Sequence, residues 1–134
     1  MRVVIIHNAE QVKSALAVAQ ELHCEVTLQS APDAVFYAGA LYLLRMFEQE
    51  KANFPDVNAQ FILDCADSRA KAIEAMQTGH LHIRSNAPES IRKKLAAIAA
   101  EQGISFHAEP YEALDLQPIR ATKDAIIKWL TREP

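Results

Sequence analysis

The sequence has little glycine: three residues in 134, with six prolines. This scarcity excludes a flexible or low-complexity chain. The turn after the first apolar run reads "HNAEQ" and has no glycine, so the phosphate-binding loops GxGxxG and GxxxxGK[ST] are absent. The two cysteines, Cys24 and Cys65, fit no CxxC or zinc spacing, and we expect small buried thiols. The sequence therefore predicts no metal site, and it leaves any cofactor unknown.

Long apolar runs and an excess of positive charge are also missing. The formal net charge is -3, which excludes a global basic field that would recruit nucleic acid. Only four consecutive apolar residues follow Arg2, too few for a signal peptide. The uncharged stretch 34–44 would span roughly 16 Å as a helix, about half of a bilayer core. We expect a cytoplasmic protein that binds neither nucleic acid nor membranes.

What the sequence does contain is an alternation of short apolar runs with helical patterns. The runs predict strands at 3–6, 25–28, 60–63, 80–83 and 104–106, and the patterns between them predict helices at 9–22, 32–52, 68–78 and 88–102. Such alternation indicates βαβ units and a parallel sheet. We predict a single three-layer α/β/α domain with a five-stranded, mainly parallel sheet in the flavodoxin-like order 2-1-3-4-5.

Local signals refine this prediction. The run "EVTLQS" alternates polar and apolar residues, as an edge strand would, whereas "VVII" is apolar throughout, as a central strand would be. Asn8, Ser30 and Asn86 stand where helix N-caps are expected, and Asp67 or Ser68 is expected to cap the third helix. Residues 1–109 are predicted to form the α/β domain. Residues 110–134 are predicted to form an extension and a separate C-terminal helix, packing on the domain or on a partner copy.

The predicted helix 32–52 has more apolar surface than one sheet can cover. Tyr37, Leu41 and Leu44 extend beyond the stripe of roughly 100° that packing on a sheet requires. Gly39, in the middle of this helix, suggests a close backbone approach. This surplus apolar surface could be covered in two ways: the C-terminal segment with Trp129 folds back over the helix, or a second copy of the chain packs on it in a homodimer. We expect Tyr37, Leu41, Leu44 and Trp129 at the resulting interface.

Ligands of open parallel sheets bind beyond the carboxyl ends of the strands. The polar residues predicted at that edge are candidates for binding a small ligand, for instance an anion: Ser30, Asp67, Arg84, Ser85 and His107. Asp64 and His7 are weak catalytic candidates, as an acid or metal-assisting carboxylate and as a general base. The structural alternative is that Asp64 forms an ion pair with Arg84. His80, His82 and His107 could share one strand face, but two histidines at i, i+2 are a weak zinc signal.

Two classes of function remain open. The leading hypothesis is a non-catalytic, homo-oligomeric module that binds a small ligand or a protein. The alternative is a small enzyme with an acid/base or metal-assisted site around Asp64, at the carboxyl edge of the sheet. No nucleophile motif supports covalent catalysis, because neither Ser68 nor Ser85 lies in a GxSxG turn.

Overall fold

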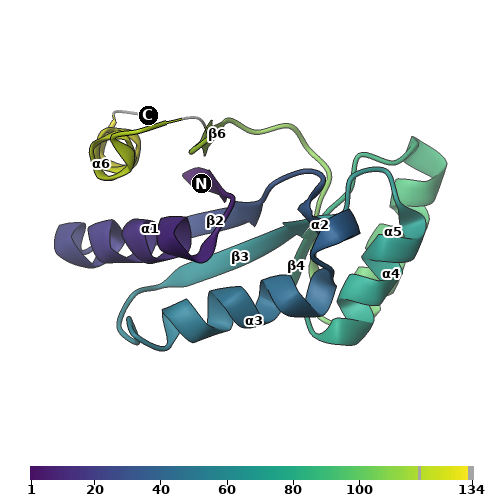
Figure 1. Ribbon diagram of the computed structural model, residues 1–134. Helices are drawn as coiled ribbons and strands as arrows, with labels where there is room; N and C mark the ends of the chain where they lie inside the picture. The colour runs from purple at the N-terminus through teal and green to yellow at the C-terminus, as the bar shows by residue number, and fades with distance from the viewer. Residues whose placement is uncertain (118, 133–134) are drawn as a thin grey trace.

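The computed structural model describes residues 1–117 and 119–132, and it shows an α/β fold with a parallel sheet, as predicted (Figure 1). The strands are β1 (Val3–Ile6), β2 (Val26–Ser30), β3 (Ala59–Asp64), β4 (His82–Arg84), β5 (Ser105–His107) and β6 (Ala113–Asp115). The helices are α1 (Ala9–Leu22), α2 (Ala34–Tyr37), α3 (Ala40–Lys51), α4 (Arg69–Thr78), α5 (Glu89–Glu101) and α6 (Thr122–Thr131). Among the described residues, each helix is too short or too polar to span a bilayer.

The strand order is β5-β4-β3-β2-β1-β6, and it differs from the predicted 2-1-3-4-5. Within the described residues the sheet has six strands, because residues 113–115 pair in parallel with β1. β2 lies between β1 and β3 and is buried along its whole length, so the prediction of an edge strand is wrong. The alternation in "EVTLQS" arises because Thr27 and Gln29 face a polar interior of the protein and not solvent.

The helices form one row rather than two layers. Neighbours in the row are α6, α1, α3, α4 and α5, which is the order in which their strands follow one another across the sheet. Each strand from β1 to β5 is added beside the previous one in a constant direction, and right-handed crossovers then place every helix on the same face. Figure 1 shows these helices in an arc around the strands. The predicted three-layer arrangement is therefore not formed.

The sheet must be curved, because the chain between its two edge strands is short. Residues 108–112, here called the connector, join His107 of β5 to Ala113 of β6. At about 3.5 Å a residue, this stretch spans at most about 21 Å. A flat sheet with strands about 4.8 Å apart would place β5 and β6 about 24 Å from each other. The connector therefore crosses the concave face of the sheet, opposite the helices.

Helix α1 shows why local signals could be trusted. Its boundaries are those predicted, its buried residues Val12, Leu16 and Ala19 share one face, and the Asn8 side chain accepts a hydrogen bond from the Gln11 backbone N–H (2.9 Å). Ser68 caps α4 in the same way, through the Lys71 N–H (3.1 Å).

Two of the other predicted caps are wrong. Ser30 is the last residue of β2, and Asn86 lies before Pro88, the N-cap position of α5. Ser30 belongs to the strand that precedes the predicted helix, so it cannot cap that helix. The turn "NAP" moves the start of α5 two residues beyond Asn86.

The predicted helix 32–52 is split into α2 and α3 at Gly39. This glycine has φ +86° and ψ 154°, a conformation that side-chain-bearing residues rarely adopt. An added Cβ would meet nothing within 4 Å, so the predicted close approach is wrong. Gly39 is required by the backbone conformation between the two helices.

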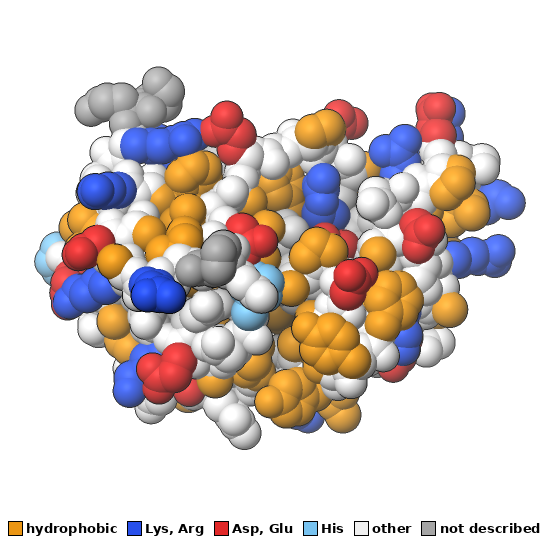
Figure 2. Space-filling model, turned by 45° about the horizontal axis from the view of Figure 1, so that its top comes forward, with side chains coloured by type: hydrophobic (Ala, Val, Ile, Leu, Met, Phe, Trp, Pro, Cys, Tyr) orange, Lys and Arg blue, Asp and Glu red, His pale blue; other side chains and the backbone are white. Residues whose placement is uncertain are grey.

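The C-terminal helix does not cover this segment. α6 packs against α1, with Ile126 fully buried, and Trp129 lies under the guanidinium groups of Arg2 (5.9 Å) and Arg132 (4.0 Å). Tyr37 and Leu41 remain 77% and 53% exposed, so the predicted cover by the C-terminal segment is wrong. β6 is the reason: its pairing with β1 holds the start of α6 on the α1 side of the molecule. Large apolar side chains gather at the lower right of Figure 2.

Candidate functional site

The two faces of the sheet differ in chemistry. Side chains that alternate toward the helices are apolar and form the core, among them Ile6, Leu28, Phe61, Leu63 and Ile83. The opposite, concave side is called here the inner face. Because partners in parallel strands point to the same side, the register places these polar residues on it: Thr27, Gln29, Asp64, His82, Arg84, His107 and Asp115. Most of them lie toward the carboxyl ends of their strands, where the sequence predicted a site.

The connector contacts the polar residues of the inner face through Tyr111. Its Tyr111 hydroxyl donates a hydrogen bond to Gln29 Oε1, and Gln29 Nε2 in turn lies 3.5 Å from Asp64 Oδ2. The Arg84 guanidinium lies 4.4 Å from the centre of the Tyr111 ring and donates to the Glu109 carbonyl (2.9 Å). No local pattern pointed to Tyr111, since it lies 82 residues from Gln29 in the chain.

Asp64 is a buried carboxyl group, only 8% exposed. Burial raises its pKa, and the Ala66 backbone N–H (2.8 Å) and the charge of Arg84 oppose this shift without cancelling it. Among the described residues, Asp64 and Arg84 form no ion pair within 4 Å, so the proposed structural pairing is not formed. Arg84 turns instead toward the connector.

The histidines do not converge on a metal. His82 Nδ1 and His107 Nε2 lie 3.2 Å apart on the inner face, and burial lowers the pKa of both rings. His80 precedes β4 and is buried beside Phe61, with its Nε2 donating to the Ala40 carbonyl (2.8 Å), so it is not on the face shared by the other two. Within the described residues, no group of three or more His, Cys, Asp or Glu side chains could hold a metal ion.

His7 follows β1 and meets Asp115, the last residue of β6. Its Nε2 lies 2.6 Å from Asp115 Oδ1, and the same carboxylate oxygen accepts a hydrogen bond from the Gln117 N–H (3.0 Å). The His7 side chain is 20% exposed, so it is reachable. Asp115 was missed because β6 itself was missed: only the pairing of β6 with β1 brings together two residues 108 positions apart.

A cavity of about 500 Å³ opens beside His7 at the carboxyl edge of the sheet. It lies between the turn that starts α1 and the segment α2–α3. Its lining is His7, Asn8, Ala9, Ala34, Tyr37, Ala38, Tyr42, Leu43 and Met46. None of these side chains is a lysine, arginine, aspartate or glutamate. Of the apolar residues singled out in the sequence, Tyr37 lines this cavity together with His7, whereas Leu41 and Leu44 lie outside it.

The other predicted ligand-binding residues lie outside this cavity. Ser30 Oγ accepts from the Asp64 N–H (2.9 Å), and Ser85 Oγ donates to the Ala66 carbonyl (3.0 Å), so both brace the turn after β3. Asp67 is exposed in that turn. Arg84 and His107 lie on the inner face, beside the connector.

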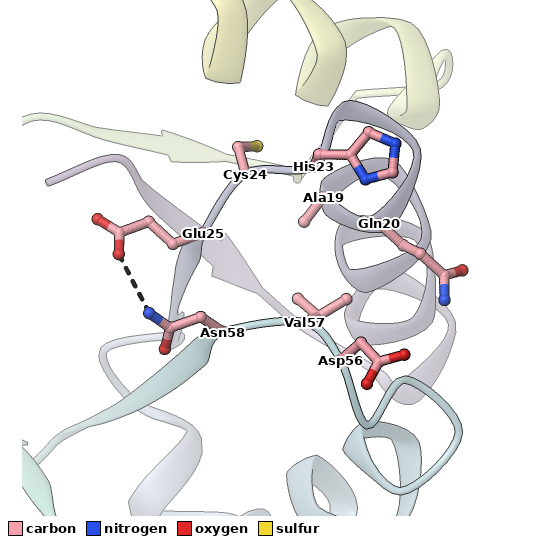
Figure 3. A pocket seen from close by; sticks show the side chains of 8 residues that line it. All are labelled: Ala19, Gln20, His23, Cys24, Glu25, Asp56, Val57 and Asn58. Atoms are coloured by element: carbon pink, nitrogen blue, oxygen red, sulfur yellow. Dashed lines mark hydrogen bonds between the residues drawn. The ribbon is translucent and has the colours of Figure 1, made fainter.

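A larger cavity, about 590 Å³, lies at the amino edge of the sheet (Figure 3). Figure 3 shows Gln20 and His23 at the end of α1 and Asp56 and Val57 in the loop before β3, while Glu25 accepts a hydrogen bond from Asn58 (3.3 Å). Burial and the neighbouring Glu25 raise the pKa of the Cys24 thiol, which weakens it as a nucleophile. Parallel sheets bind ligands at the other edge, so we favour the cavity beside His7.

Comparisons with known proteins show the fold and nothing finer. No family model matches the chain, and no curated protein matches it. A crystal structure of a candidate fructose-1,6-biphosphate aldolase from Coccidioides immitis is similar, with a TM-score of 0.68 and 20% sequence identity. The likeness covers 82% of this chain and 41% of that one, so this chain spans about two-fifths of the length of the aldolase structure. At this identity the likeness supports the α/β fold with its parallel sheet.

Proposed function

We propose that this protein binds a small organic ligand in the cavity beside His7. One observation carries the proposal: a cavity of about 500 Å³ at the carboxyl edge joins a histidine held by a carboxylate to a wall of tyrosine, leucine and methionine. Its volume falls within the range of small-molecule sites, roughly 300–1,000 Å³. The lining has no fixed charge, so the ligand is mostly apolar and turns one polar group toward His7.

Ligand-observed NMR by saturation transfer tests this proposal on the full chain. The probes are phenylpyruvate, phenylacetate, p-cresol and methylphosphonate, a phosphate mimic whose methyl protons can be observed. We expect the aromatic probes to receive saturation and methylphosphonate to receive none. Tyr42→Ala removes part of the apolar wall and should reduce the signal several-fold. Leu81→Ala, at an exposed apolar residue outside this cavity, is the matched control and should leave it unchanged. Absence of binding by every aromatic probe would refute the proposal.

We also propose that the protein self-associates through α2 and α3. Four large side chains of this segment are at least half exposed: Phe36, Tyr37, Leu41 and Tyr42. A contiguous apolar patch of this kind commonly marks an interface. Light scattering should give the mass of a dimer, and Leu41→Lys should give the mass of a monomer. A wild-type monomer at high protein concentration would contradict this.

A cytoplasmic location is part of the same proposal. It is supported by two free thiols, Cys24 and Cys65, which fit a reducing compartment. A fluorescent fusion of the full chain tests it, and an extracellular signal would contradict it.

A second candidate function is acid/base chemistry at Asp64. The observation that favours it is a buried carboxyl group whose pKa is raised and that lacks a direct ion pair, as catalytic carboxyl groups often do. Carbon-13 NMR of the Asp64 carboxyl group, with and without the probes above, distinguishes the two candidates. A probe that moves the Asp64 titration favours the inner face, whereas a probe that perturbs only His7 favours the cavity.

A further inference from the structure

We infer that His7 is a catalytic base and that the ligand of the cavity is a small carbonyl compound with an apolar body and an acidic α-hydrogen. This inference rests on the proposed ligand site and replaces the expectation of a non-catalytic module. Three features of the site carry it: the tautomer of His7, the reach of its second nitrogen, and the phenol groups across the cavity.

The tautomer follows from the partner. An ionised carboxylate only accepts hydrogen bonds, so the 2.6 Å contact to Asp115 Oδ1 requires the hydrogen on His7 Nε2. In the neutral ring, Nδ1 then carries a lone pair. A carboxylate that fixes the tautomer and stabilises the imidazolium formed on protonation is the arrangement by which many enzymes prepare a histidine base. Asp115 is therefore a positioning residue.

The second nitrogen is available. Within the described residues, His7 Nδ1 has no hydrogen-bond partner, yet it is absent from the buried polar atoms that lack one: His80 Nδ1, Arg92 Nε and Trp129 Nε1. It is consequently open to solvent on a residue that lines the cavity.

The tyrosines of the cavity can stabilise the negative charge that develops on the substrate's carbonyl oxygen. Tyr37 and Tyr42 line the same cavity as His7, so a phenol hydroxyl can donate a hydrogen bond to a bound carbonyl oxygen. In the proposed step the α-carbon–hydrogen bond breaks and its proton bonds to His7 Nδ1. The electron pair of the broken bond moves to form the enolate, with its charge on the carbonyl oxygen. Return of the proton restores the keto form, so no oxidant, reductant or co-reactant is needed.

The apolar body of the substrate follows from the rest of the lining. Ala34, Ala38, Leu43 and Met46 offer no hydrogen bonds through their side chains, and their burial against an aryl or branched alkyl group provides binding energy. A small, fully hydrated acid such as pyruvate would leave these apolar side chains exposed to water and should bind poorly.

Hydrogen–deuterium exchange tests the inference. We would follow the loss of the C3–H signal of phenylpyruvate in D2O by proton NMR, with pyruvate as the comparison probe. The full chain should accelerate exchange of phenylpyruvate above the buffer rate and leave pyruvate near it. His7→Asn should reduce the acceleration by about 100-fold or more, as loss of a general base does. His23→Asn, at an exposed histidine on the other edge of the sheet, should retain it.

Asp115→Asn and the binding assay separate the outcomes. If Asp115 orients the base, the saturating exchange rate falls at least about 10-fold while the half-saturating concentration of phenylpyruvate stays the same; a merely structural role would change both or neither. Saturation transfer without accelerated exchange would overturn this inference and leave the proposed ligand site standing. Absence of any aromatic binding would overturn both. Exchange that survives in His7→Asn would overturn the role of His7 alone.

Discussion

Buried titratable side chains carry most of the pH dependence that this molecule should show. Asp64 and His80 are 8% and 1% exposed, and burial shifts their pKa values in opposite directions, upward for the acid and downward for the base. In both cases the charged form is the one that folding disfavours. The two residues therefore respond in opposite senses to acid.

Asp64→Asn should stabilise the protein at neutral pH. The folded pKa is raised, so above it the ionised carboxylate costs free energy that the amide avoids, while the amide oxygen can still accept from the Ala66 N–H. The expected gain is on the order of 1 kcal/mol. The gain should shrink as pH falls through the folded pKa, since both proteins are then uncharged at this position. Urea unfolding at several pH values measures it, and a variant less stable at neutral pH would contradict it.

His80 should make the fold sensitive to mild acid. Its Nε2–H donates to the Ala40 carbonyl and its Nδ1 has no partner, so a second proton would be buried without an acceptor, even though Ala40 and the charge of Glu48 partly favour it. Because the folded pKa is lowered, this contribution is complete above the unfolded value, about 6.5, and is lost as pH falls below it. His80→Gln should flatten the slope of unfolding free energy between neutral and mildly acidic pH. His23→Gln, at an exposed histidine, should leave the slope unchanged.

At the scale of single elements, glycine conformation decides where α2 ends and α3 begins. Gly39→Ala should destabilise the protein by about 1–3 kcal/mol, the cost of a side-chain-bearing residue in a backbone region that is nearly reserved for glycine. Nothing lies within 4 Å of the added methyl group, so the loss reports backbone conformation alone.

Gly103→Ala is the matched control. Its surroundings are equally open, but its φ of +71° lies nearer the left-handed helical region that other residues visit at a lower cost. Thermal unfolding of the two variants should rank Gly39→Ala as the more damaging. Equal losses would contradict this account of the α2–α3 break.

Individual elements are also where the sequence predicted most. The caps at Asn8 and Ser68 and the bounds of α1 are local signals, and the structure confirms them. Strand order is not local. Thr27 and Gln29 read as solvent-facing because most polar residues are, and only the curved sheet reveals that they face its interior. The Asp115 partner of His7 depended on pairing across most of the chain, and no spacing rule could have supplied it.

At the scale of the whole molecule, the short connector should control the inner face. Inserting Gly-Ser-Gly-Ser between Ala108 and Glu109 should cost about 1 kcal/mol or less in loop closure and leave β6 paired with β1. It should loosen Tyr111 from Gln29 and Arg84, which NMR of the Gln29 side-chain amide would detect. The same insertion after Asn53, in the turn between α3 and β3, should leave that amide signal in place. An unperturbed Gln29 amide after the first insertion would contradict the role given to the connector.

The length of the connector limits how far apart the two edge strands of the sheet can lie. A connector that is one residue shorter or longer would therefore change the curvature of the sheet. The distances between the polar side chains on the inner face would change with it. A change of length in one loop can therefore alter the geometry of the inner face without a substitution in any of its polar residues.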